Sequence, residues 1–119
     1  MSYLRGTEVV ERYLDRLVSH DWDGMAACLT PDVVRVGPFG DTYSPRDAYV
    51  AFLADLMPQL SNYSMDVSRV TYGDGMAVAE LSETMDVDGS ALRTPETLVF
   101  ELDDAGLIAR IAIYIQRQP

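Results

Sequence analysis

Lysine is absent from this chain, and cysteine, histidine and tryptophan occur only once each. A single cysteine excludes a disulfide bond within the chain and a metal site built from cysteines. No apolar run approaches the roughly 18 residues that a membrane-spanning helix requires. The first ten residues, MSYLRGTEVV, lack the apolar block of a signal peptide. We therefore expect a soluble, cytoplasmic protein without a metal ion.

Positive charge is also scarce. Nineteen acidic residues stand against nine basic ones, all of them arginine, and the formal net charge is −10. Such an acidic surface repels phosphate backbones and anionic lipids, so we expect no nucleic acid and no membrane as partner. The 48% share of hydrophobic residues is enough to bury a core, and 119 residues suit one domain.

Apolar residues recur at helical spacing in the first half of the chain. One stripe follows Thr7, which can cap a helix, and runs through residues 9–18. A shorter stripe follows Asp21 over residues 22–29. The valines of residues 33–36 then predict a strand that stops at the sequence GPFG.

A third helix begins with the clearest start signal in the sequence. Ser44 is expected as its cap, Pro45 as its first helical residue, and Asp47 as the partner that completes a capping box. Aromatic and aliphatic residues line one face until Pro58 ends the helix.

The second half of the chain changes to a period of two. Alternating apolar residues predict four strands separated by the turns YGDG, DG and DDAG. The element order predicts an α+β protein with helices packed on one face of a curved antiparallel sheet.

The segment ERYLDRLVSHDWDGMAACLTPDVVRVGP, followed by YSPRDAYVAFL, resembles the nuclear transport factor 2-like superfamily. This superfamily holds ketosteroid isomerases, SnoaL-type polyketide cyclases, limonene epoxide hydrolases and scytalone dehydratases. The resemblance implies a single SnoaL-like domain over residues 1–119, in which three N-terminal helices pack on a curved mixed, mostly antiparallel sheet. It also implies a cone-shaped cavity and a homodimer packed through the outer sheet face.

Three positions can be compared with the ketosteroid isomerases. Aligned on the sequence DWDG, Tyr13 falls where that family has a tyrosine that donates a hydrogen bond to the substrate oxygen. Gly37 falls on the general base, and Leu98 on a second, protonated aspartate. Because two of the three groups are missing, we expect no standard steroid isomerase chemistry, and the sequence VGPFG is the edge of a pocket that lacks its acid.

Two glutamates can replace the missing acids. If Asp88–Gly89 forms the hairpin turn, Glu83 faces Thr94 and Leu81 faces Glu96, so both glutamates lie on the apolar face. Two carboxylates in a dry cavity raise one pKa and create an acid/base pair. The alternatives are a bulge that turns one or both outward, or a one-residue slip that brings other residues inward, namely Glu80, Ser82 and Thr84.

The candidate catalytic residues are therefore Tyr13, Glu83 and Glu96. Residues expected to line a hydrophobic, ligand-binding pocket are Trp22, Phe39, Asp41, Tyr49, Phe52, Leu98 and Ile113, although aromatic residues at such spacings are core by default. Arg35 lies between valines of the first strand and can pair with an acid.

Two functions follow from these residues. One is a cofactor-independent cyclase, hydrolase, dehydratase or isomerase that acts on a small apolar, oxygenated molecule. The alternative is a non-catalytic dimer that binds a hydrophobic ligand or a protein partner.

Overall fold

The computed structural model describes residues 8–116, and its centre is a six-stranded sheet in the order β2-β1-β6-β5-β4-β3. The parallel pair is β1 with β6, and the other neighbouring strands run antiparallel. The predicted α+β class is confirmed. The strands are β1 (Leu29–Val36), β2 (Thr42–Tyr43), β3 (Ser64–Gly73), β4 (Met76–Val87), β5 (Ser90–Leu102) and β6 (Ile108–Ile115).

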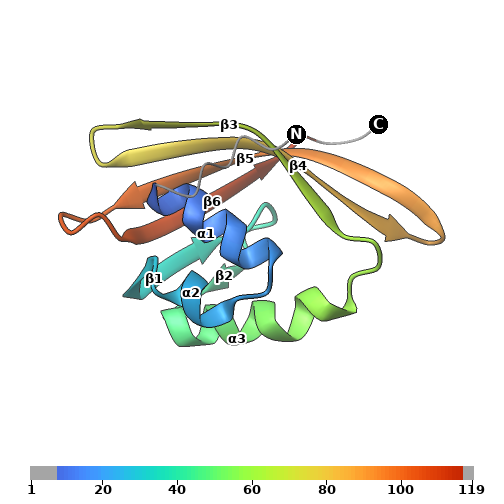
Figure 1. Ribbon diagram of the computed structural model, residues 1–119, viewed down its shortest axis with the longest axis horizontal. Helices are drawn as coiled ribbons and strands as arrows, with labels where there is room; N and C mark the ends of the chain where they lie inside the picture. Colours follow the sequence, from blue (N-terminus) through green and yellow to red (C-terminus); the bar gives the residue numbers. More distant parts are fainter. Residues whose placement is uncertain (1–7, 117–119) are drawn as a thin grey trace.

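The helices lie on one side of the curved sheet (Figure 1). α1 (Val9–Val18) and α2 (Trp22–Ala26) precede β1, whereas α3 (Arg46–Leu56) follows β2 and continues into a 3-10 turn at Met57–Gln59. No helix within residues 8–116 is long and apolar enough to cross a membrane. The β3–β4 and β4–β5 hairpins extend toward opposite ends of the molecule (Figure 1).

The core fills the space between the helices and the face of the sheet that they cover, here called the inner face. Tyr13 of α1 meets Phe100 of β5 edge-on, with ring centroids 5.8 Å apart. Burial of such side chains is the main favourable term in folding. Other fully buried members are Leu14, Met25, Leu29, Val33, Tyr49, Val67, Ile108 and Ile111.

Two-residue turns close both hairpins. Asp88 and Gly89 have φ values of 51° and 82°, and Asp74 and Gly75 have 49° and 72°. Left-handed conformations at both turn positions are typical of tight hairpins whose twist matches that of the strands. The predicted register is confirmed, since Glu83 pairs with Thr94, and Leu81 with Glu96.

The first strand differs from the prediction. It begins at Leu29 rather than residue 33, because α2 ends at Ala26 and Leu29 already pairs with Ile108 of β6. Pro31, which cannot donate a ladder hydrogen bond, falls within a shift of that register between Leu29 and Val34. The short strand β2 was not predicted.

The predicted start of the third helix is wrong by one residue. Pro45 occupies the N-cap position and the helix begins at Arg46. The Ser44 hydroxyl instead donates to the Val33 carbonyl at 2.8 Å, which ties this corner to β1. Asp21 caps α2 as expected, accepting from the Gly24 amide at 3.0 Å. Thr7 lies outside the described residues.

The Asp88–Gly89 turn gives a first testable prediction. A Cβ at Gly89 or at Gly73 meets open space, but only Gly89 has a positive φ, of 82°. Gly89→Ala should therefore lower the free energy of unfolding by about 1 kcal/mol through backbone strain alone. Gly73→Ala is the matched control and should stay within about 0.5 kcal/mol of the parent in urea titrations. Equal losses in both variants would contradict this account of the turn.

Candidate functional site

Glu83 and Glu96 lie side by side on the inner face of the β4–β5 hairpin. Their register makes them diagonal neighbours, and Glu96 is hydrogen-bonded to Glu83. The Tyr63 hydroxyl donates to Glu83 Oε2. Glu80 forms an exposed ion pair with Arg69. The one-residue slip that would have turned Glu80 inward is therefore wrong.

This pair holds a proton. Burial raises the pKa of Glu96 to about 9, and the hydrogen bond and negative charge of Glu83 act in the same direction, while the charge of Arg35 lowers it. Burial and the charge of Glu83 also raise the pKa of Tyr63 far above the ordinary phenol value. These raised pKa values favour the protonated forms of Glu96 and Tyr63 at neutral pH, beside Glu83.

A second polar group joins α1 to α3. The hydroxyl oxygens of Tyr13 and Tyr49 lie 2.5 Å apart, and both rings are buried. Burial raises the pKa of both phenols, and the charge of Glu83 raises both further. Two phenols hold two protons, and the bond between them uses one. One O–H therefore stays available to a third acceptor.

An ion pair joins Arg35 of β1 to Asp41 of the β1–β2 loop and lies against Gly37. Arg35 Nη1 donates to Asp41 Oδ2 at 2.7 Å. A Cβ built on Gly37 would lie 2.6 Å from that oxygen and 2.7 Å from Nη1. Partial desolvation raises the pKa of Asp41, but the hydrogen bond from Arg35 lowers it, and the net shift is downward. The position without a side chain is thus occupied by the Asp41 carboxylate.

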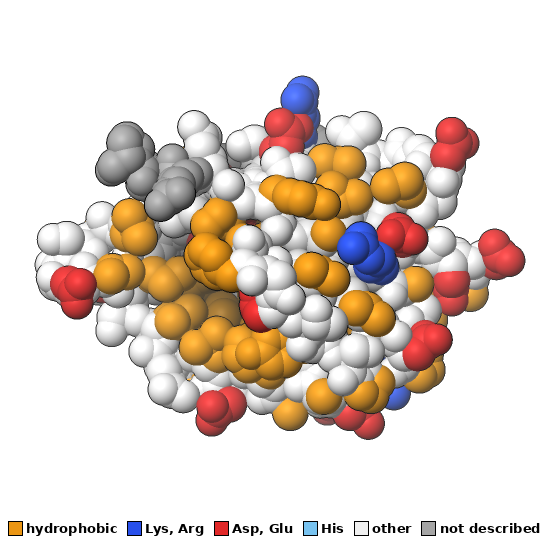
Figure 2. Space-filling view, turned by 180° about the vertical axis from the view of Figure 1, so that it is seen from behind, with side chains coloured by type: hydrophobic (Ala, Val, Ile, Leu, Met, Phe, Trp, Pro, Cys, Tyr) orange, Lys and Arg blue, Asp and Glu red, His pale blue; other side chains and the backbone are white. Residues whose placement is uncertain are grey.

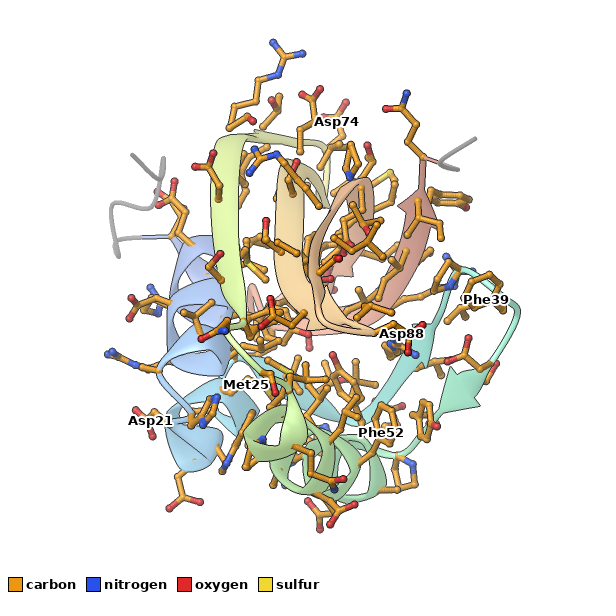
Figure 3. The ribbon with its side chains drawn as sticks, turned by 90° about the vertical axis from the view of Figure 1, so that its right-hand side faces the viewer. Asp21, Met25, Phe39, Phe52, Asp74 and Asp88 are labelled. Carbon is orange, nitrogen blue, oxygen red and sulfur yellow. The ribbon has the colours of Figure 1, made fainter. Side chains whose placement is uncertain are left out.

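The structure brings together only part of the expected pocket lining. Phe52 stacks on Tyr43 with centroids 3.9 Å apart, next to the loop that carries Asp41. Leu98 is buried in the core, and the partly buried Ile113 packs against this core. Trp22 instead stacks on His20 at 5.3 Å. Phe39 is 85% exposed, and Figure 3 shows it at the outer side of its loop, apart from Phe52.

The surface of the described residues is hollowed (Figure 2). Figure 2 shows a recess rimmed by hydrophobic side chains, with an acidic side chain at its edge. A hollow of about 420 Å³ includes Ser82, Thr97 and Tyr114, which leave the sheet on the face opposite to Glu83. Leu81 and Glu96 also line this hollow, so it borders one member of the acid pair.

The sequence did not predict the hydrogen bond from Tyr63 to Glu83 or the stacking of Tyr43 on Phe52. Tyr63 alternates with polar residues in the same way as Met65 and Val67. This pattern predicts which face its ring lies on, but not the partner of its hydroxyl. Arg35 was expected to pair with an acid, and Asp41 is that acid. Within residues 8–116, no group of three His, Cys, Asp or Glu side chains could hold a metal ion.

Helices cover one face of a curved, mixed sheet, and polar side chains lie between the two layers. The chain belongs to the SnoaL-like domain family, whose model matches residues 10–111. The resemblance to the nuclear transport factor 2-like superfamily is thereby confirmed. No curated protein matches the sequence significantly.

Solved structures share the fold. A Kribbella flavida DSM 17836 protein, proposed to be a ketosteroid isomerase, aligns with a TM-score of 0.80 at 20% identity, over 93% of this chain and 77% of its own. An M. tuberculosis LEH-like epoxide hydrolase gives 0.79 at 19% identity, over 91% and 80%. A Shewanella denitrificans OS-217 protein, proposed to be a SnoaL-like polyketide cyclase, gives 0.79 at 12% identity, over 91% and 88%. At these identities the likeness establishes the fold alone.

The buried proton on Glu96 makes stability depend on pH. Between the ordinary glutamate pKa, about 4.3, and the folded value, about 9, the folded state keeps a proton that the unfolded chain releases. The free energy of unfolding should therefore fall as pH rises through this window. Glu96→Gln should flatten that fall, because the amide is neutral at every pH.

Glu101→Gln is the matched control, since Glu101 lies on the same strand but forms an exposed ion pair with Arg110. Thermal unfolding of the three proteins between pH 5 and pH 9 makes the comparison. If Glu96→Gln and the parent lose stability equally with rising pH, Glu96 is ionised in the folded state.

Proposed function

We propose that this protein is a cofactor-independent acid/base enzyme that acts on a small apolar, oxygenated molecule, as an isomerase, cyclase, dehydratase or hydrolase does. The observation that carries the proposal is the adjacency of Glu83 and Glu96 on the inner face, where burial and Glu83 raise the pKa of Glu96. A proton acceptor and a proton donor at adjacent positions are what proton transfer between two substrate atoms requires. The names of the fold neighbours, which include an isomerase, a cyclase and an epoxide hydrolase, support small-molecule chemistry.

Each group has a distinct role in the proposed reaction. Glu83 removes a proton from a carbon next to a substrate carbonyl, and the electron pair moves onto the carbonyl oxygen. The O–H that remains free in the Tyr13–Tyr49 pair donates to this oxygen as negative charge develops. Glu96 then gives its proton to the substrate. Tyr63 fixes the orientation of Glu83 through its hydrogen bond.

The proposed reaction differs from that of a standard ketosteroid isomerase. Gly37 and Leu98 carry no acid, so neither can act as base or oxyanion donor. In the proposed pocket Phe52, Leu98 and Ile113 contribute apolar contacts to the substrate, beside Tyr49 and the loop that holds Asp41. The remaining candidates, Trp22 and Phe39, would contribute from its periphery.

A non-catalytic, dimeric binding domain is the second candidate. The hollow of about 420 Å³ on the outer face, with Tyr114 60% exposed beside it, favours contact with another molecule there. A half-exposed sheet is commonly covered in symmetric dimers. We propose a homodimer through this face, which is compatible with either function.

The proton-transfer role can be tested without knowing the natural substrate. A carboxylate base next to a phenol donor should exchange the α-protons of a bound ketone with deuterated water. We expect the protein to accelerate this exchange for 1-indanone or 4-phenyl-2-butanone, followed by proton NMR. Glu83→Gln should lower the catalysed rate at least tenfold, since general bases typically contribute a factor of about 10² to 10⁴.

Glu80→Gln is the matched control, because Glu80 lies three residues away on the same strand but in an exposed ion pair. It should exchange the ketones at the parent rate. Exchange no faster than in buffer, or equal rates for Glu83→Gln and the parent, would contradict the proposed chemistry.

The proposed dimer predicts a mass twice that of the 13.2 kDa chain in light scattering at micromolar concentration. Tyr114→Arg should shift the mass toward the monomer, because it places a charge in the outer-face contact. Phe39→Arg, at an even more exposed aromatic residue on the β1–β2 loop, should leave the mass unchanged. A monomeric parent protein would exclude the dimer.

A further inference from the structure

Arg35 is buried more deeply than its ion pair explains. Its side chain is only 13% exposed, yet its ion-pair partner Asp41 is 43% exposed. The guanidinium lies over the Tyr43 ring, 5.6 Å from the centroid. Arg35 Nε is buried without a hydrogen-bond partner among the described residues. A buried charged donor that lacks a partner is costly, so its position needs an explanation.

The surrounding chain preserves this arrangement. Gly37 does not have a positive φ, so its backbone conformation does not require glycine. Its missing side chain instead leaves room for the Arg35–Asp41 pair, which any Cβ would crowd. The Gly37 amide donates to the Asp41 carbonyl at 2.7 Å, which brings the loop back over Arg35.

Arg35 also reaches the proposed catalytic groups. It pairs with Ile111 of β6, which lies opposite the buried Phe100, and its positive charge lowers the pKa of Tyr13 and of Glu96 against the effect of burial. The side chain therefore faces the same interior as the acid pair, while Asp41 holds it from the solvent side.

We propose that the substrate carries a carboxylate, and that Arg35 binds it through the unpartnered Nε–H beside the β1–β2 loop. The substrate class is then an apolar carboxylic acid with a second oxygen function, such as a carbonyl, further along its skeleton. This proposal rests on the proposed function, because it uses the same site: Arg35 anchors one end, and the Tyr13–Tyr49 pair holds the second oxygen.

The chemistry of the guanidinium selects this ligand. Arginine offers only donors, so its partner must be an acceptor, and its planar fork matches the two oxygens of a carboxylate. A cationic ligand would be repelled by Arg35. A dianionic phosphate would face the negative charges of Asp41 and Glu83 together. A single carboxylate carries the least charge that still forms a charge-assisted hydrogen bond.

The experiment compares two probes with one skeleton, 3-phenylpropanoate and 3-phenyl-1-propanol, by isothermal titration calorimetry. The parent protein should bind the carboxylate about ten- to a hundredfold more tightly, the range expected for a hydrogen bond to a charged group. Arg35→Gln should lose this preference. Arg110→Gln, which removes an exposed arginine from an ion pair on the neighbouring strand, should keep it.

Asp41→Asn also tests whether Arg35 binds the carboxylate. Asp41 is more exposed than Arg35, so this variant should fold even if Arg35→Gln does not. Removing the negative charge beside Arg35 should increase the preference for the carboxylate. In nitrogen-15 spectra, the Arg35 Nε–H signal should shift with 3-phenylpropanoate and not with the alcohol.

The outcomes separate this proposal from the proposed function. Equal affinities for the two probes in the parent protein, or a preference retained in Arg35→Gln, would overturn the role of Arg35. If ketone exchange still depends on Glu83 in that case, the proposed function stands. If the parent protein binds neither probe and exchanges no ketone, both proposals fail.

Discussion

The pairing between β4 and β5 is the constraint on which the rest of the site depends. Its register follows from the Asp88–Gly89 turn, where both residues adopt left-handed conformations. Because side chains alternate between the faces of a strand, this one turn sets the position of every side chain in the hairpin. It places Glu83 and Glu96 on the inner face and leaves Glu80 outside with Arg69. A shift of one residue would exchange these roles and bury Ser82 and Thr84 instead.

Local sequence patterns were sufficient for this hairpin. The DG turn, the alternation and the apolar rows all act over short distances along the chain, so the sequence alone predicts which glutamates face inward. Tyr13 was predicted as a hydrogen-bonding residue, but its contact with Tyr49 depends on how α1 packs against α3. In β3, the inward row changes from odd to even numbers between Val67 and Val70, where the pairing with β4 shifts. That change of phase in the sequence is a usable sign of a bulge.

The loop around Gly37 was beyond such patterns. The sequence predicts a strand that stops at this glycine, and β1 does end just before it, at Val36. It contains no local signal that Asp41, four residues later, returns its carboxylate to the vacant space. The position of Asp41 depends on the pairing of β2 with β1. Because β2 has only two residues, no sequence pattern predicts this pairing. The cap of α3 was missed for a similar reason, because the Ser44 hydroxyl bonds to β1 and not to its own helix.

Arg35 and the Glu83–Glu96 pair act on each other through charge. Burial contributes most to the raised pKa of Glu96, and the negative charge of Glu83 adds to it, whereas the positive charge of Arg35 opposes both. A substrate carboxylate bound to Arg35 would offset the positive charge and shift this balance further toward the protonated acid. The same event would place the substrate beside Glu83. Binding at the loop would therefore prepare the acid while it positions the reacting carbon, and an uncharged analogue of the substrate would do neither.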